Sequence, residues 1–223
     1  MTASFNKQLY IAVEGIDGSG KTTAVKFIED LIRRKGHTCL AIREPGTTAL
    51  GEKIRDIIKN LFALGYTPSD SVLSMLVNAA RLDMLEQTVE PAKERFILSD
   101  RCFISTMAYQ NKSNINTLAY QNKSNINTLL CNLGTRNLTK IPDLIFILDV
   151  DYDTANSRVY GRGLKSDDIL DAPSRAEFEK RRRIYLDFGR NSTDLKTRIV
   201  YINGGQTREE VEEDIYKELC HYL

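Results

Sequence analysis

The sequence predicts an α/β fold in which a mostly parallel sheet of five strands is flanked on both sides by helices. Five short apolar runs are continuous rather than alternating, which is typical of strands buried on both faces of a parallel sheet. Between them, apolar residues recur at helical spacing, so strand and helix alternate along the chain. The expected strands are Leu9–Val13, Cys39–Ile42, Phe96–Leu98, Leu144–Leu148 and Ile199–Ile202.

Helices are expected between these strands because the apolar residues of each intervening stretch share one face. No linker-like stretch interrupts the pattern, and we therefore expect residues 1–223 to form a single domain. The apolar groups that define three of the helices are Val25, Ile28 and Ile32; Ile54, Ile58 and Leu61; and Val211, Ile215 and Leu219.

The composition excludes several classes of protein. The chain carries 31 basic and 30 acidic side chains, a net charge of +1, and 42% of its residues are apolar. That apolar fraction excludes a disordered chain, and the balanced charge argues against a general nucleic-acid-binding protein, which needs a basic face. The longest purely aliphatic or aromatic run, Leu144–Leu148, is too short to span a membrane.

The N-terminus and the cysteines predict a cytoplasmic protein. The segment Met1–Lys7 is polar and has no feature of a signal peptide. The cysteines have neither zinc-site nor disulfide spacing, and only two histidines accompany them, so we expect reduced thiols. These residues are Cys39, Cys102, Cys131 and Cys220, with His37 and His221.

A segment of eleven residues is duplicated in tandem. Residues 108–118 read AYQNKSNINTL, and residues 119–129 repeat the same letters. Two copies are too few for a solenoid, which needs at least three. We interpret the repeat as an insertion tolerated in a surface segment, because the cost of closing a loop grows slowly with its length.

A phosphate-binding loop (P-loop) is the clearest motif. Residues 15–22, GIDGSGKT, match G-x-x-x-x-G-K-[ST] between an expected strand and an amphipathic helix. The glycines let backbone N–H groups turn inward around phosphate oxygens, and the helix N-terminus adds partial positive charge. Lys21 is expected to reach the β- and γ-phosphates, and the Thr22 hydroxyl to ligate Mg²⁺. The chain is therefore expected to bind a nucleoside triphosphate.

Two further segments separate a kinase from a GTPase. Residues 111–114, Asn-Lys-Ser-Asn, lack the carboxylate of the guanine-reading N-K-x-D and do not follow an apolar strand. By contrast, Asp100 and Arg101 follow the third expected strand, where Asp100 is placed to hold the metal, directly or through water. Arg101 can make bidentate contacts to an incoming phosphate. A helix-capping Asp with a surface Arg is the alternative interpretation of this pair.

Together, these motifs resemble those of thymidylate kinases of the bacterial kind, over roughly residues 8–217. The resemblance implies a three-layer P-loop kinase fold with a mobile lid, and phosphorylation of dTMP to dTDP by ATP and Mg²⁺. The matching segments are AVEGIDGSGKTT at 12–23, similar to the family's FEGxDGxGKTT; REPGT at 43–47, similar to REPGGT; AAR at 79–81; DRCFISTMAYQ at 100–110, similar to DRxxxSTxAYQ; and Pro142-Asp143 with Leu148-Asp149-Val150, similar to PD…LDV.

The resemblance also implies three sets of site residues. The set that binds ATP is Gly15, Ile16, Asp17, Gly18, Ser19, Gly20, Lys21, Thr22 and Thr23, with Gly204, Gly205 and Gln206. The set that binds dTMP is Asp17, Arg43, Ile58, Val77, Arg81, Arg101, Ser105, Thr106, Tyr109 and Gln110. The set near the metal is Thr22, Asp100 and Asp17.

Within these sets, the resemblance implies individual roles. Arg43 and Arg101 clamp the acceptor phosphate, and Arg81 and Gln110 read the thymine edge. Asp17 hydrogen-bonds the 3′-hydroxyl, Tyr109 presses against the deoxyribose, and Ser105 and Thr106 line the same pocket. The catalytic residues expected for phosphoryl transfer are Lys21, Asp100, Arg101, Arg43, Arg158 and Arg162.

The lid is expected over residues 158–175, which are polar and punctuated by glycine. Because the variable positions of the P-loop contain no Arg or Lys, we expect the lid to supply the transition-state arginine, from Arg158 or Arg162. The run Lys180–Arg183 is interpreted as a solvated helix face, with contact between its arginines and the nucleotide as the alternative. The apolar stretch Val72–Leu85 suits either a homodimer interface, as in the family, or the core.

Two departures from the family pattern affect the acceptor site. Val77 stands where the family usually has a Phe that stacks on thymine, and Cys102 replaces an aromatic residue. We expect a weaker or broader acceptor site, unless Phe103 or Met84 takes the place of that Phe. The alternatives are a kinase of another pyrimidine deoxynucleotide or a deoxynucleoside, or a non-catalytic nucleotide-dependent binding module. Paired arginines, Arg43 and Arg101, favour a phosphorylated acceptor.

Overall fold

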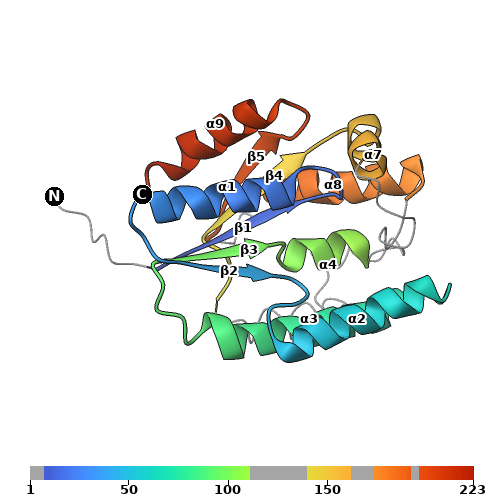
Figure 1. Ribbon diagram of the computed structural model, residues 1–223. Coiled ribbons are helices and arrows are strands. Elements are labelled where there is room, and N and C mark those ends of the chain that lie inside the picture. Colours follow the sequence, from blue (N-terminus) through green and yellow to red (C-terminus); the bar gives the residue numbers. More distant parts are fainter. Residues whose placement is uncertain (1–7, 111–139, 162–172, 192–195) are drawn as a thin grey trace.

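A five-stranded parallel sheet in the order β2-β3-β1-β4-β5 forms the centre of the molecule (Figure 1). The computed structural model describes residues 8–110, 140–161, 173–191 and 196–223. All five predicted strands are confirmed, as is the α/β class. Their bounds are β1 Leu9–Gly15, β2 Cys39–Arg43, β3 Phe96–Asp100, β4 Leu144–Asp149 and β5 Arg198–Asn203.

Helices α1 (Lys21–Arg34) and α9 (Arg208–Leu219) cover one face of the sheet (Figure 1). Ile28 and Ile32 of α1 and Ile215 of α9 pack with strand residues in one apolar cluster. Because β1 and β4 are covered on both faces, their residues are almost all buried, which explains the continuous apolar runs in the sequence.

The opposite face is covered by α4 (Phe103–Tyr109), α8 (Arg175–Asn191) and the C-terminal end of α3 (Asp70–Met84). A π-helical turn, Leu85–Val89, continues α3. Helix α7 (Tyr152–Tyr160) follows β4. The molecule therefore has three layers, with the sheet in the middle (Figure 1).

Helix α2 (Ala49–Ala63) packs along α3 at the edge of the molecule. Ile54, Ile58 and Val77 are buried in the seam between the two helices. The stretch Val72–Leu85 is therefore partly core, as one of its two interpretations predicted. Large apolar side chains also remain about half-exposed on this pair of helices, namely Leu50, Ile57, Val72 and Met75.

Side chains at the helix starts explain several element boundaries. Thr48 accepts a hydrogen bond from the Gly51 N–H at the start of α2, and Asp151 accepts one from the Thr154 N–H at the start of α7. Thr207 and Glu210 form a reciprocal capping box on α9. Helix α4 has no such cap from its own N-cap residue, Cys102.

No helix in the described ranges is both long and apolar enough to cross a membrane. Cys39, Cys102 and Cys220 are free thiols, whereas Cys131 lies outside the described residues. The duplicated segment beyond Gln110 and the predicted lid from residue 162 to residue 172, including Arg162, also lie outside them.

Candidate active site

The P-loop connects β1 to α1 at the carboxyl end of the sheet, as the sequence predicts. Gly20 at the helix start has a φ of 101°, in the left-handed region that favours glycine. Lys21 is only 7% exposed, and its ammonium donates a hydrogen bond of 2.9 Å to the Ile16 carbonyl. Lys21 is thus folded back over the loop, where phosphate oxygens are expected to bind.

The loop after β5 lies directly against the P-loop. A Cβ atom at Gly204 would lie 2.9 Å from the Ser19 carbonyl oxygen and 3.0 Å from that of Asp149, so only glycine fits without movement. Ser19 Oγ and Gln206 Oε1 are buried, and neither has a hydrogen-bond partner among the described residues. The two loops therefore form one polar surface, and their joint assignment to ATP stays a prediction.

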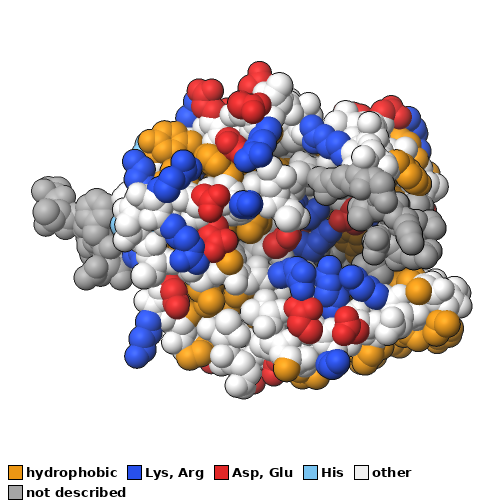
Figure 2. All heavy atoms as spheres, in the orientation of Figure 1, with side chains coloured by type: hydrophobic (Ala, Val, Ile, Leu, Met, Phe, Trp, Pro, Cys, Tyr) orange, Lys and Arg blue, Asp and Glu red, His pale blue; other side chains and the backbone are white. Residues whose placement is uncertain are grey.

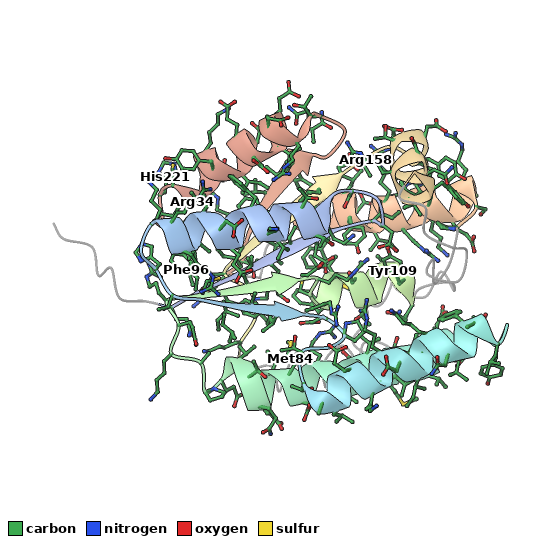
Figure 3. All side chains as sticks on the ribbon, in the orientation of Figure 1. Arg34, Met84, Phe96, Tyr109, Arg158 and His221 are labelled. Atoms are coloured by element: carbon green, nitrogen blue, oxygen red, sulfur yellow. The ribbon has the colours of Figure 1, made fainter. Side chains whose placement is uncertain are left out.

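Arg158 is directed to this loop and not toward the acceptor side. Its guanidinium donates to the carbonyl oxygens of Gly204 at 2.6 Å and Gln206 at 3.4 Å. In Figure 3, Arg158 lies on the side of α7 and β4, whereas Tyr109 lies at the end of α4. Arg158 therefore braces the loop after β5 in this structure, and its assignment as the transition-state arginine remains a prediction.

Asp17, Arg101 and Tyr109 form a connected cluster between the P-loop and α4. Arg101 forms an ion pair with Asp17 Oδ1, and the Tyr109 hydroxyl donates to Asp17 Oδ2 at 2.9 Å. The Arg101 guanidinium lies 5.2 Å from the centre of the Tyr109 ring, and it also donates to Ser105 Oγ at 3.0 Å. The structure thus brings together four residues that the sequence assigns to the acceptor site.

The backbone of Arg101 adopts a conformation that is uncommon for a non-glycine residue, with a φ of 75°. Its N–H donates to the Val13 carbonyl at 3.0 Å, and its carbonyl accepts from Ser99 Oγ at 2.6 Å. Such strain persists where the surroundings determine it, and it concentrates at functional sites. These contacts direct the Arg101 side chain toward Asp17.

Two groups of the cluster have shifted pKa values. Burial opposes ionisation of Asp17, but the positive charges of Arg101 and Lys21 outweigh it and lower the pKa of Asp17 below its usual range. Burial and the charge of Arg101 lower the pKa of Lys21 to about 8, although Asp17, Asp100 and Glu14 act in the opposite direction. Around neutral pH, Asp17 is ionised and Lys21 is mostly protonated.

The shifted pKa of Lys21 predicts that ATP binding takes up a proton above pH 8. Bound phosphates favour the charged ammonium, so they raise the pKa of Lys21 from its free value of about 8. At pH 8.5, calorimetric titration with ATP in buffers of different ionisation enthalpy should detect net uptake of a fraction of a proton per site. Affinity should fall as the pH rises past 8. The variant Lys21→Met should show neither effect, and proton uptake that survives in it would contradict this origin.

Arg81 is buried in a network of three partners. It donates to Glu44 at 2.6 Å, to Asn78 Oδ1 at 2.5 Å and to Thr106 Oγ1 at 2.7 Å. Burial opposes its positive charge, but the adjacent Glu44 outweighs this effect and raises the pKa of Arg81. Motif matching identified Arg81 and Thr106, but it did not show that Glu44 pairs with Arg81.

Arg43 has an acidic partner that the sequence analysis did not anticipate. Its guanidinium contacts both carboxylate oxygens of Glu52, at 2.7 and 3.0 Å, which lowers the pKa of Glu52. The half-buried Arg55 also lies here. Burial and the nearby charges of Arg43 and Arg101 lower the pKa of Arg55, and the charge of Asp100 acts in the opposite direction. Figure 2 shows Lys and Arg side chains gathered beside a hollow above α2. Arg55, whose guanidinium donates to the Pro45 carbonyl at 3.2 Å, is not among the site residues that the motifs indicated.

Glu14 is the main residue of this region that sequence reasoning missed. Its side chain is fully buried. Its carboxylate accepts hydrogen bonds from the N–H groups of Cys102 at 2.7 Å and Ser105 at 3.0 Å, and from Ser105 Oγ at 2.8 Å. Glu14 therefore supplies, from β1, the N-terminal cap that α4 lacks locally. Its place directly before the P-loop glycine was the available signal.

The arginines of α8 correct the interpretation of Lys180–Arg183 as a solvated face. Arg181 is only 6% exposed, and its guanidinium lies 4.7 Å from the centre of the Tyr109 ring, so that ring contacts both Arg101 and Arg181. Arg182 forms two hydrogen bonds with Asp149, at 2.6 and 2.8 Å. Because α8 packs against α4, the solvated-face interpretation is wrong for Arg181, whereas Arg182 is partly exposed and is held by Asp149 at the end of β4.

The donor set beside the P-loop fits a magnesium ion that is bound mainly by phosphates and water. Thr22 is exposed in the first turn of α1, and the Asp100 carboxylate is close enough to act on the pKa of Lys21. Both oxygens of Asp17 are engaged by Arg101 and Tyr109, so Asp17 is not arranged as a direct ligand. Thr22 and Asp100 are the residues that would hold the ion.

The remaining residues predicted for the site lie on several different elements. Thr23 lies in the first turn of α1, and Gly205 follows β5. Ile58 and Val77 pack against each other's helices, so their contact with an acceptor stays a prediction. Gln110 ends α4, and its Oε1 is buried without a partner among the described residues.

Comparison with known proteins identifies close similarity to one family. A family model described as thymidylate kinase matches residues 13–215. The chain is 31% identical to a thymidylate kinase of Thermoanaerobacter sp. (strain X514), over 97% of this chain and 100% of that protein. It is 31% identical to one of Buchnera aphidicola subsp. Acyrthosiphon pisum (strain APS), over 97% of each chain. It is 32% identical to one of Thermosipho africanus (strain TCF52B), over 93% and 95%.

Proposed function

Because this chain belongs to the thymidylate kinase family, we propose that it transfers the γ-phosphoryl group of ATP to dTMP, with release of ADP and dTDP. The observation that carries this proposal is the cluster of Asp17, Arg101 and Tyr109, which joins the P-loop to α4. There the loop expected to bind the ATP phosphates meets the cationic side of the site, where the acceptor is expected to bind. Phosphoryl transfer requires this juxtaposition of two anionic substrates.

The side chains act by positioning and by neutralising charge. An oxygen of the acceptor phosphate attacks the γ-phosphorus, and the bond from that phosphorus to the β-phosphate oxygen breaks. Lys21 and the N–H groups of the P-loop hold the donor phosphates. Arg101, which Ser105 and Asp17 orient, stabilises the charge on the transferred group.

The other polar groups keep the two substrates in line. Tyr109, in contact with both Arg101 and Arg181, forms one wall beside the deoxyribose. Arg43 and Arg55 supply positive charge for the acceptor phosphate. Mg²⁺, when bound with ATP, neutralises negative charge on the phosphate oxygens, and Thr22 and Asp100 would hold it.

The test is ADP formation from ATP and Mg²⁺ with dTMP, dUMP, dCMP, dGMP or thymidine as acceptor. We expect a clear preference for dTMP and loss of turnover in Lys21→Ala. The matched control is Lys26→Ala, an exposed lysine on the same helix, which should keep full activity. Activity spread evenly over the pyrimidine nucleotides would contradict dTMP specificity. ATP binding without turnover on any acceptor would instead support a nucleotide-dependent binding module.

We propose that the protein is a cytoplasmic homodimer that pairs through α2 and α3. Leu50, Ile57, Val72 and Met75 are 43–50% exposed, and Figure 2 shows hydrophobic side chains along this lower edge. Exposed apolar patches of this kind are typical of protein–protein interfaces. Sedimentation velocity should give twice the chain mass of 25.3 kDa, and Met75→Glu should shift the protein to monomer. A wild-type protein that sediments as a monomer would refute this arrangement.

A further inference from the structure

We propose that Asn78 determines specificity in the acceptor site by donating a hydrogen bond from its side-chain amide to the 4-carbonyl oxygen of a pyrimidine base. This inference rests on the proposed function, because it concerns the base of the nucleotide that the kinase phosphorylates. Asn78 is outside the motifs that the sequence analysis singled out.

The Asn78 amide is buried with only one of its ends paired among the described residues. The residue is 8% exposed, its Oδ1 accepts a hydrogen bond of 2.5 Å from Arg81 Nη1, and its Nδ2 has no partner in that part of the chain. Buried polar groups nearly always have a partner, so a buried donor left unpaired is a candidate contact for a ligand.

The contact with Arg81 determines which way the amide points. A guanidinium contains only donors, so the oxygen of Asn78 must face Arg81 and the NH₂ group must point away from it. Arg81 is itself held by Glu44 at 2.6 Å and by Thr106 at 2.7 Å. Asn78 Nδ2 is therefore a donor fixed in direction before any ligand binds.

An acceptor with the complementary property lies directly after α4. Gln110 Oε1 is buried and also without a partner in the described ranges. The hydrogen bond from Arg81 to Thr106 joins α3 to α4, with Asn78 one turn before Arg81 and Gln110 one turn after Thr106. Because α3 and α4 run in opposite directions (Figure 1), Asn78 and Gln110 lie on the same side of this bond.

A fixed donor and an acceptor on the same side of the Arg81–Thr106 bond match one type of pyrimidine. Thymine and uracil present a carbonyl oxygen at position 4 and an N–H at position 3, which complement Asn78 and Gln110. Cytosine presents an amino group at position 4 and an acceptor at position 3, so it would place a donor against the Asn78 donor. The pair therefore favours 4-oxo over 4-amino pyrimidines.

The test is Asn78→Asp, which keeps the shape of the side chain and replaces the donor with an acceptor. We expect the ratio of kcat/KM for dTMP to that for dCMP to fall about 100-fold. The adjacent Arg81 compensates the new charge. The matched control is Ser74→Ala, another buried polar residue on α3, which should leave the ratio unchanged.

The outcomes separate this inference from the proposed function. If the wild-type protein phosphorylates no deoxynucleotide, both fail. If it prefers dTMP and the ratio is the same in a folded Asn78→Asp protein, Asn78 does not read the base and only this inference fails. Should Asn78→Asp not fold, Asn78→Ser replaces it, and an unchanged ratio there refutes the inference equally. Calorimetric titration with dTMP gives a second readout, in which we expect weaker binding.

Discussion

Replacing Arg101 with alanine is expected to lower kcat/KM for dTMP about 1,000-fold, because this arginine connects the donor and acceptor sides of the cleft. Its guanidinium contacts Asp17 of the P-loop and Ser105 of α4 and lies against Tyr109. Alanine removes the cation and leaves the Asp17 carboxylate without it, next to incoming phosphates. Steady-state kinetics with both substrates measures the effect.

Arg101→Lys tests whether the loss comes from charge or from geometry, and Arg33→Ala is the control. Arg101→Lys keeps the charge but cannot bind Asp17 and Ser105 through a planar fork, so we expect an intermediate loss. Arg33→Ala removes an exposed arginine that pairs with Glu29 on α1 and should leave kcat/KM unchanged. If Arg101→Ala keeps more than a tenth of the wild-type kcat/KM, Arg101 does not stabilise the phosphoryl group during transfer.

Replacing Glu14 with alanine is expected to lower the free energy of unfolding by about 2–4 kcal/mol. The substitution removes the acceptor for the buried N–H of Cys102, for the partly buried N–H of Ser105 and for the Ser105 hydroxyl. Helix α4 then lacks an N-terminal cap, and Ser105 no longer holds Arg101 in place. Urea unfolding, followed by circular dichroism, measures the stability.

A conservative change at Glu14 distinguishes the loss of the hydrogen-bond acceptor from the loss of side-chain volume. Glu14→Gln keeps one oxygen for the backbone N–H groups, so we expect less than half the destabilisation of alanine. The control Glu209→Ala removes an exposed carboxylate in the first turn of α9 and should cost well under 1 kcal/mol. Equal stability of Glu14→Ala and the wild-type protein would contradict the capping role.

The sheet and the P-loop were predictable because each depends on local sequence. A strand buried on both faces must be apolar at consecutive positions, as Leu144–Leu148 is. Gly20 is required where φ is positive at the start of α1, and Lys21 has to follow it there. Such constraints act within a few residues, so they can be recognised along the chain.

The partners of the arginines were not predictable in the same way. Arg43 and Arg81 were assigned to the acceptor from their motifs, and Arg158 to the transferred phosphate from its place in the expected lid. In the structure they contact Glu52, Glu44 and the Gly204 carbonyl. Two of these pairs join residues that are 37 and 46 positions apart in the sequence, and no local pattern indicates which acceptor a guanidinium will reach. The same limit explains the error over Arg181, whose burial depends on the packing of α8 against α4.

The residues of the P-loop and the order of strands and helices along the chain could be established from sequence, because they depend on backbone conformation and on apolar periodicity. The resemblance to one kinase family could also be established, because it depends on short motifs of named residues. The arrangement of charges in the cleft required the tertiary structure. Whether Glu14 caps α4, whether Arg101 contacts Asp17, and where the Asn78 amide points are decided by side chains from different elements. Their electrostatic and hydrogen-bonding energies depend on distances and burial that exist only once the chain has folded.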